Sequence, residues 1–177
     1  MLFRSRTTSR TIASATTPTY ALTYRPTDKI SVYGSHAEYF ESGTIVGSAY
    51  VNNNAVLPPA KTKQNEIGVK YANKDLLYSL ALFDIEQANN IRVDRGGLAY
   101  LEQNGKLRHR GIELGISGKI APKWSLAFGA AYMNAFYDKT EGGRRDGVTE
   151  DGQPRWNGTL MAKYAADDKF SAFARQY

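Results

Sequence analysis

Apolar residues alternate with small or polar residues along several segments of about ten residues. In 62–71, Ile67, Val69 and Tyr71 share one side of the expected strand, and polar residues and glycine share the other. A repeat of two residues is typical of a β-strand with two unlike faces. The pattern predicts eight strands, over 19–24, 29–39, 62–71, 76–87, 108–119, 123–136, 155–164 and 169–177, although 81–86 fits a helical turn equally well.

Short and long connections alternate between these strands. The tight turns lie at 25–29, 72–75, 120–123 and 165–168, and the long polar stretches lie at about 40–62, 88–106 and 137–154. In an antiparallel meander, this alternation gathers all the long loops at one end of the sheet. Outer-membrane barrels have short periplasmic turns and long external loops, so the spacing predicts an antiparallel transmembrane β-barrel segment.

The two faces of the strands and the aromatic residues favour the same class of protein. The face opposite the bulky residues is largely glycine, serine and alanine, which suits the polar interior of a wide barrel. Aromatic residues lie near the short turns (Tyr24, Tyr71, Trp124, Tyr164) and near the long loops (Tyr132, Phe136, Tyr137, Trp156). Two such belts are typical of the two membrane–water interfaces.

Composition is compatible with this prediction. The 177 residues, about one domain in length, contain no cysteine and carry a formal net charge of +6, and their mean hydropathy is −0.48. Low mean hydropathy is expected of a membrane barrel because only alternate residues meet lipid. The basic residues are scattered through turns and loops, so the charge does not indicate binding to nucleic acid.

The first 17 residues do not match the rest of the pattern. They are rich in Ser and Thr, contain basic but no acidic residues, and lack the apolar core of a secretory signal. We expect 1–17 to be disordered, as part of a loop of a larger protein, and 18–177 to form the barrel segment. An organelle transit peptide is the alternative for 1–17.

Several motifs resemble one protein family in the same order. The most specific is 57–71, in which Pro58 and Pro59 end an extended loop and an alternating strand follows. The others are 21–26 followed by 30–33, 108–114 followed by 117–119, and 154–157. Over 18–177 the chain resembles the TonB-dependent siderophore receptors of the bacterial outer membrane.

This resemblance implies a fold, a location and a function. The family has a 22-stranded barrel closed by an N-terminal plug, and it takes up ferric siderophores with energy from an inner-membrane complex. The chain would supply about eight strands from the C-terminal half of that barrel. Expected partners are outer-membrane lipid, the ferric siderophore as transported ligand, and the TonB complex through an N-terminal part that this chain lacks.

Four arginines are candidates for binding sites. Arg108 and Arg110 share the parity of Ile112, so they are expected to point outward at the long-loop end, where they could contact lipopolysaccharide phosphates. Arg144 and Arg145 lie in a Gly-rich loop and could attract an anionic ferric chelate. The alternatives are ordinary solvated charges for the first pair and a mobile loop for the second.

No catalytic, cofactor or metal site is predicted. His36 and His109 are far apart in sequence, and no nucleophile–base or phosphate-loop motif is present. We therefore expect a protein that is not an enzyme. Two other folds remain open: a small closed eight-stranded outer-membrane barrel with a structural or adhesive role, and a soluble eight-stranded ligand-binding barrel.

Overall fold

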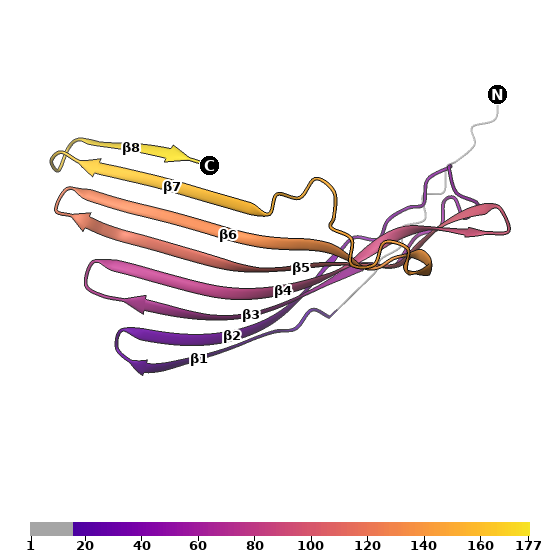
Figure 1. Cartoon of the computed structure of the whole chain (residues 1–177), viewed down its shortest axis with the longest axis horizontal. Helices are drawn as coiled ribbons and strands as arrows, with labels where there is room; N and C mark the ends of the chain where they lie inside the picture. Colours follow the sequence, from indigo (N-terminus) through magenta and orange to yellow (C-terminus); the bar gives the residue numbers. More distant parts are fainter. Residues whose placement is uncertain (1–15) are drawn as a thin grey trace, which may run out of the picture.

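A single sheet of eight antiparallel strands accounts for nearly all the structure (Figure 1). The computed structural model describes residues 16–177, so most of the segment 1–17 lies outside the described residues. The strands follow one another in sequence order: β1 (Thr19–Thr27), β2 (Ile30–Glu41), β3 (Ala60–Ala72), β4 (Leu76–Arg95), β5 (Leu98–Ala121), β6 (Trp124–Lys139), β7 (Trp156–Ala165) and β8 (Ser171–Gln176), with a short 3-10 helix η1 (Glu141–Gly143) before β7. The predicted up-and-down antiparallel sheet is confirmed.

The sheet is open, with β1 at one edge and β8 at the other. Within residues 16–177, the strand order contains no pairing between these two edges. The alternative of a small closed eight-stranded barrel is therefore not favoured. Both edge strands have unpaired backbone groups on one side, as expected of a portion of a larger wall.

The connection between β4 and β5 differs from the prediction. The stretch 88–106 was expected to be a loop, but β4 continues to Arg95 and β5 begins at Leu98. Gly96 and Gly97 have φ values of 58° and 81°, which suits a two-residue turn whose central residues both need positive φ. The resulting external hairpin, residues 88–105, projects beyond the other strands (Figure 1). The helical alternative for 81–86 is wrong, because this run lies within β4.

The strand register brings the predicted faces together. Leu114 of β5 lies opposite Leu80 of β4 and Ala130 of β6, and Leu80 lies opposite Val69 of β3. These residues form an apolar band on one face, called here the outer face. The neighbouring Glu113 lies opposite small residues of β4 and β6 on the inner face. The alternation therefore assigned the two faces correctly.

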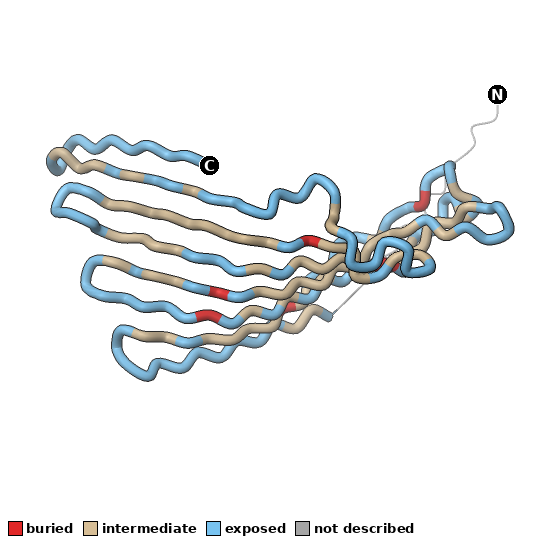
Figure 2. Tube along the Cα trace, viewed as in Figure 1, coloured by how far each residue is buried: buried red, intermediate tan, exposed pale blue. Residues whose placement is uncertain are grey.

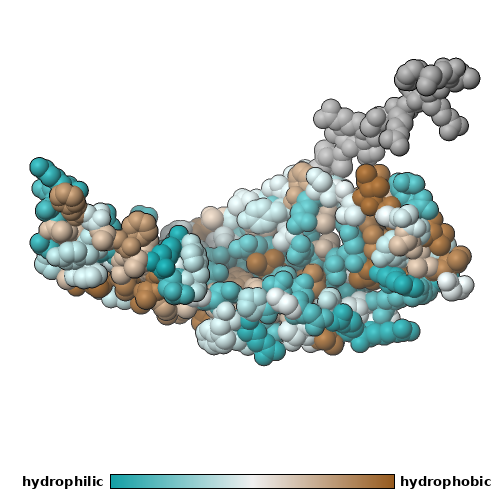
Figure 3. Space-filling view, turned by 90° about the horizontal axis from the view of Figure 1, so that it is seen from above, coloured by the Kyte–Doolittle hydropathy of each residue, from teal (hydrophilic) through white to brown (hydrophobic). Residues whose placement is uncertain are grey.

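Almost nothing is buried inside this sheet (Figure 2). Among residues 16–177, the buried hydrophobic residues are Ala37, Val46, Ala81 and Ala135, and many larger apolar side chains are exposed beside polar ones (Figure 3). A soluble ligand-binding barrel would enclose an apolar interior, so this alternative does not fit. In the same residues, no helix has the length and apolarity needed to cross a membrane.

Two inner-face aromatic residues cover glycines on the neighbouring strand. A Cβ on Gly68 would lie 2.6 Å from the ring of Tyr33, and one on Gly111 would lie 2.5 Å from the ring of Phe83. Phe83 interrupts the alternation of β4 in the sequence. Its ring is accommodated on the inner face because Gly111 has no side chain.

Aromatic pairs mark both ends of the apolar band. Near the short turns, the ring centroids of Trp124 and Tyr164 are 4.9 Å apart, and those of Tyr71 and Tyr78 are 6.0 Å apart. Tyr132 and Trp156 form the matching pair toward the long loops, at 4.9 Å. On β6 the two levels are separated by eight residues, or roughly 27 Å along the strand. Tyr137 does not join this belt, because it follows Phe136 and faces the inner side.

Candidate ligand site at the long-loop end

A pocket lined by arginines lies between the external hairpin and the loop from β6 to β7. Its volume is about 430 Å³. Its lining, called here the arginine pocket, includes Asn89, Arg92, Tyr137, Glu141, Arg144 and Arg145. Three guanidinium groups and one carboxylate line the pocket, and the Asp94 and Asp151 carboxylates pair with two of the guanidinium groups.

Hydrogen bonds to the side chains of Asp146 and Thr140 fold the loop that carries the two predicted arginines. The Asp146 carboxylate accepts bonds from the Thr140 amide (2.7 Å) and from the Thr140 hydroxyl (2.8 Å). The Arg145 amide donates to the Thr140 hydroxyl at 3.0 Å. Gly142 and Gly143 adopt positive φ, which glycine allows without strain. This part of the loop is therefore a compact turn.

Arg145 is held in place by two contacts. Its guanidinium lies 4.3 Å from the ring centroid of Tyr137 and donates to the Asp151 carboxylate at 2.9 Å. The Asp151 hydrogen bond is the largest cause that raises the pKa of Arg145 above its ordinary value. Tyr137 thus contacts the pocket from the inner side of β6 through a cation–π interaction.

Arg144 differs from the other two arginines of the pocket in its contacts. Its side chain makes no hydrogen bond or ion pair within residues 16–177, whereas Arg92 donates to Asp94 at 3.0 and 3.2 Å. An unpaired guanidinium beside an aromatic ring and amide side chains suits an anionic, partly aromatic ligand. The two candidate residues, Arg144 and Arg145, both line this pocket.

Sequence reasoning missed the other wall of this pocket. Asn89, Asn90 and Arg92 belong to β4, in the stretch that was expected to be a loop. The adjacent glycines Gly96 and Gly97 were the available signal, because a Gly-Gly pair between two runs is typical of a tight hairpin.

Arg108 and Arg110 lie on the outer face, in line with Ile112. Arg108 donates two bonds of 2.8 Å to the Asp84 carboxylate, and Arg110 donates one of 3.0 Å to the same group. Arg108 also lies 4.0 Å from Asp138. Arg110 has about half of its side chain exposed, so it is the more accessible of the two.

The two histidines lie in separate polar pairs. A ring nitrogen of His36 lies 2.8 Å from the Asn65 amide oxygen on the outer face. A ring nitrogen of His109 lies 3.0 Å from the Glu150 carboxylate, which joins β5 to the β6–β7 loop. Across residues 16–177, no group of three or more His, Cys, Asp or Glu side chains could hold a metal ion.

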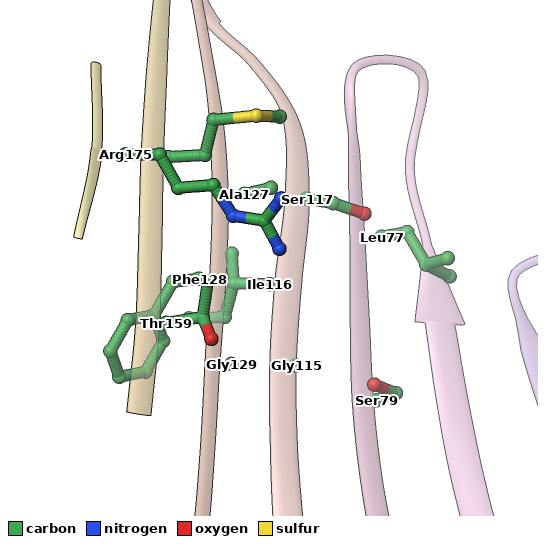
Figure 4. Close-up of a pocket in the computed structure, with 11 residues that line it drawn as sticks. Leu77, Ser79, Gly115, Ile116, Ser117, Ala127, Phe128, Gly129, Thr159 and Arg175 are labelled. Carbon is green, nitrogen blue, oxygen red and sulfur yellow. The ribbon is translucent and has the colours of Figure 1, made fainter. Parts of the chain in front are cut away.

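A shallow trough occupies the inner face near the short turns (Figure 4). It has a volume of about 340 Å³ and small lining residues, among them Ser79, Gly115, Ser117, Ala127, Gly129 and Thr159. Arg175 of β8 extends toward Ser117 (Figure 4). Because its lining residues are small, the trough leaves space on the inner face near the short turns. It offers few groups for specific recognition of a ligand.

Comparison with known proteins decides the family. The family described as "TonB dependent receptor-like, beta-barrel" matches residues 3–177. The chain belongs to this family of TonB-dependent receptors. Members of the family are outer-membrane β-barrel proteins that act as receptors and transporters, so this chain is a wall segment of an outer-membrane barrel.

Several receptors are similar to this chain. The ferrichrome outer membrane transporter/phage receptor of Escherichia coli K12 is 27% identical over 141 residues, which are 78% of this chain and 18% of that protein. The probable TonB-dependent siderophore receptor PiuA of Acinetobacter baumannii is 29% identical over 149 residues, which are 79% of this chain and 20% of that protein. The chain thus spans about a fifth of the length of these relatives.

Solved structures of receptors share the same fold. The ferric preacinetobactin receptor BauA of Acinetobacter baumannii matches with a TM-score of 0.72 and 32% identity, over 86% of this chain and 23% of that one. The ferripyoverdine receptor of Pseudomonas aeruginosa matches with a TM-score of 0.69 and 22% identity, over 90% of this chain and 22% of that one. Both likenesses show a shared fold, which forms one portion of a longer chain in each solved structure.

Proposed function

We propose that this chain forms part of the wall of an outer-membrane receptor that takes up ferric siderophores, and that the arginine pocket contacts an anionic chelate. The observation that carries the proposal is the unpaired Arg144 beside Arg145 and Tyr137, at the long-loop end of the wall. The names of the relatives, which include ferrichrome and catecholate receptors, support the substrate class. The proposed partners are lipid, ferric siderophore and the TonB complex, and the protein is a receptor rather than an enzyme.

Charge favours a catecholate chelate over a neutral one. Catecholate oxygens leave a ferric chelate with net negative charge, whereas hydroxamates neutralise the iron. A guanidinium forms its strongest hydrogen bonds with anionic oxygens. The unpaired Arg144 guanidinium of the arginine pocket therefore suits the charged chelate, and the stacked pair of Arg145 and Tyr137 offers a surface for its aromatic rings.

The test compares binding of a ferric tris-catecholate and of ferrichrome to the receptor that contains this wall. We expect Arg144→Ala with Arg145→Ala to weaken catecholate binding by about tenfold or more, because charge-assisted hydrogen bonds are lost. The effect should shrink in high salt. Arg25→Ala, on the first strand near a short turn, is the control and should bind normally. Unchanged binding in the double variant would exclude the arginine pocket as the ligand contact.

We propose a second role, in lipid binding, for Arg110 assisted by Arg108. Arg110 lies just beyond the apolar band on the outer face and keeps half of its side chain exposed. Because Asp84 binds Arg108 through two hydrogen bonds, Arg110 is better placed to contact a lipopolysaccharide phosphate. Receptor purified with Arg108→Ala and Arg110→Ala should retain less lipopolysaccharide than a Lys123→Ala control. Equal retention would contradict this role.

A further inference from the structure

The external hairpin has only two strands of its own. Beyond the wall, β5 loses its partner on one side, since β6 pairs with it only from Lys106 onward. A two-stranded hairpin is marginally stable in water without further support. Something else must therefore hold residues 88–105 in one position if they are to form a fixed wall of the arginine pocket.

A turn in the loop between β2 and β3, residues 51–54, forms hydrogen bonds with the free edge of β5. The Val51 amide donates to the Ala99 carbonyl at 2.9 Å. The Asn52 side chain then donates to the Leu101 carbonyl at 2.9 Å and accepts from the Leu101 amide at 3.1 Å. The side-chain amide of Asn52 thus makes the same pair of bonds that a peptide of a neighbouring strand would make.

This loop is itself folded tightly enough to position Asn52. The Val46 amide donates to the Ala55 carbonyl, and the Asn54 amide donates to the Val46 carbonyl, both at 2.9 Å. Val46 is 1% exposed, which makes it the most buried large side chain in residues 16–177. A loop closed around a buried valine can act as a rigid support for the hairpin.

The opposite edge of the hairpin contacts the arginine pocket. The Asp94 amide of β4 donates to the Glu141 carboxylate of η1 at 2.9 Å. Asn90 also donates to the Thr44 hydroxyl of the β2–β3 loop at 3.3 Å. The segment from Asn89 to Arg92 therefore lies between two loops, and its position depends on both.

We propose that Asn52 is a positioning residue for the arginine pocket. Its side chain joins the β2–β3 loop to the β5 edge of the external hairpin and so holds the hairpin in place. The β4 edge of the same hairpin forms one wall of the arginine pocket, so Asn52 acts on the pocket without touching it. The β2–β3 loop, the external hairpin and the β6–β7 loop therefore act as one folded unit. The predicted effect on ligand binding rests on the function proposed above, whereas the effect on hairpin stability does not.

Amide hydrogen exchange in the intact receptor, reconstituted in lipid, tests this proposal. In Asn52→Ala, we expect exchange at Leu101 and across 89–95 to become about tenfold faster, because two hydrogen bonds that close the hairpin edge are lost. Affinity for the ferric tris-catecholate should fall several-fold. Asn53→Ala is the matched control and should behave as the wild type. Asn53 is exposed, and within residues 16–177 its side chain forms a hydrogen bond with Asn54 alone.

A second variant distinguishes a role of Asn52 in hydrogen bonding to Leu101 from a role in side-chain packing. Asn52→Asp keeps the shape of the side chain and the acceptor for the Leu101 amide, but loses the donor to the Leu101 carbonyl. If the hydrogen bonds to Leu101 hold the hairpin, exchange should be faster than in the wild type, because a carboxylate oxygen then faces the Leu101 carbonyl; a packing role predicts wild-type exchange. Wild-type exchange over 89–101 in Asn52→Ala would overturn the inference. Faster exchange in Asn52→Ala, together with normal chelate binding in the Arg144 and Arg145 double variant, would retain the positioning role for the hairpin and reject the proposed ligand site.

Discussion

Below the level of Tyr132 and Trp156, most strands of the sheet repeat the same arrangement, with bulky residues outward and small or polar residues inward, although Tyr33, Leu77 and Phe173 face inward. Above that level, the external hairpin and the two long loops are held by individual contacts such as Asn52 with Leu101 and Asp94 with Glu141. The wall depends on the solvent that each face meets, because lipid offers no hydrogen bonds and favours apolar surface. The external end depends on particular side chains, so a single substitution there can affect residues far along the chain.

The largest effect in the wall should come from placing a charge on the outer face. Leu114→Lys puts an ammonium group in the apolar band, where Leu114 is 42% exposed. We expect a loss of roughly 2–4 kcal/mol in the free energy of unfolding, as for a lysine near the middle of a bilayer. Chemical unfolding of the receptor in lipid vesicles measures this loss.

Glu113→Lys is the matched control for that substitution. The residue precedes Leu114 and faces the inner side, opposite Ala81 and Ala131. Because a charge is already present there, the free energy of unfolding should change by less than about 1 kcal/mol. If both variants lose equal stability, the assignment of lipid to the outer face is wrong.

A smaller effect is expected on the inner face, from added volume. A Cβ on Gly111 would collide with the Tyr132 carbonyl oxygen and with the ring of Phe83, whereas one on Gly129 would meet nothing within 4 Å. Gly111→Ala should therefore destabilise the barrel by about 1–3 kcal/mol, the usual cost of overpacking. Gly129→Ala, on the adjacent strand, should be close to neutral. The same unfolding experiment compares the two, and equal stabilities would argue against the close packing of β4, β5 and β6 at Gly111.

The wall could be predicted from the sequence because lipid and water impose a local pattern. Ile67, Val69 and Tyr71 reveal their common face within five residues, without information from any other strand. Phe83 was harder to interpret, since its place on the inner face depends on Gly111 in the next strand. The aromatic pairs were also predictable in position, although Tyr137 could not share the face of Phe136 in a regular strand.

The external end was predicted less well, for a physical reason. A hairpin in water needs no apolar alternation, so 88–106 resembled a polar loop apart from its Gly-Gly turn. The bond between Asn52 and Leu101 joins residues 49 positions apart, and nothing local to either residue indicates it. Arg144 and Arg145 were candidates on the evidence of their own loop, and both line the arginine pocket. Their neighbours from β4 could not be predicted in this way, because they approach only after the hairpin has formed.

The smallest expected effect concerns the aromatic belts, and it tests where the wall ends. The two tryptophans of the chain, Trp124 and Trp156, lie at opposite ends of the apolar band, each beside a tyrosine. Amphipathic rings favour the headgroup level, so both should lie at a membrane interface. Fluorine NMR of receptor labelled with fluorotryptophan gives a signal for each tryptophan ring. The signal that is lost in Trp124→Phe belongs to Trp124, and the one lost in Trp156→Phe belongs to Trp156. Lipids that carry a spin label at the headgroup should broaden both signals more than lipids labelled at the chain end. If only the Trp124 signal broadens, Trp156 lies outside the membrane interface. The part of the sheet within the membrane would then end below Trp156.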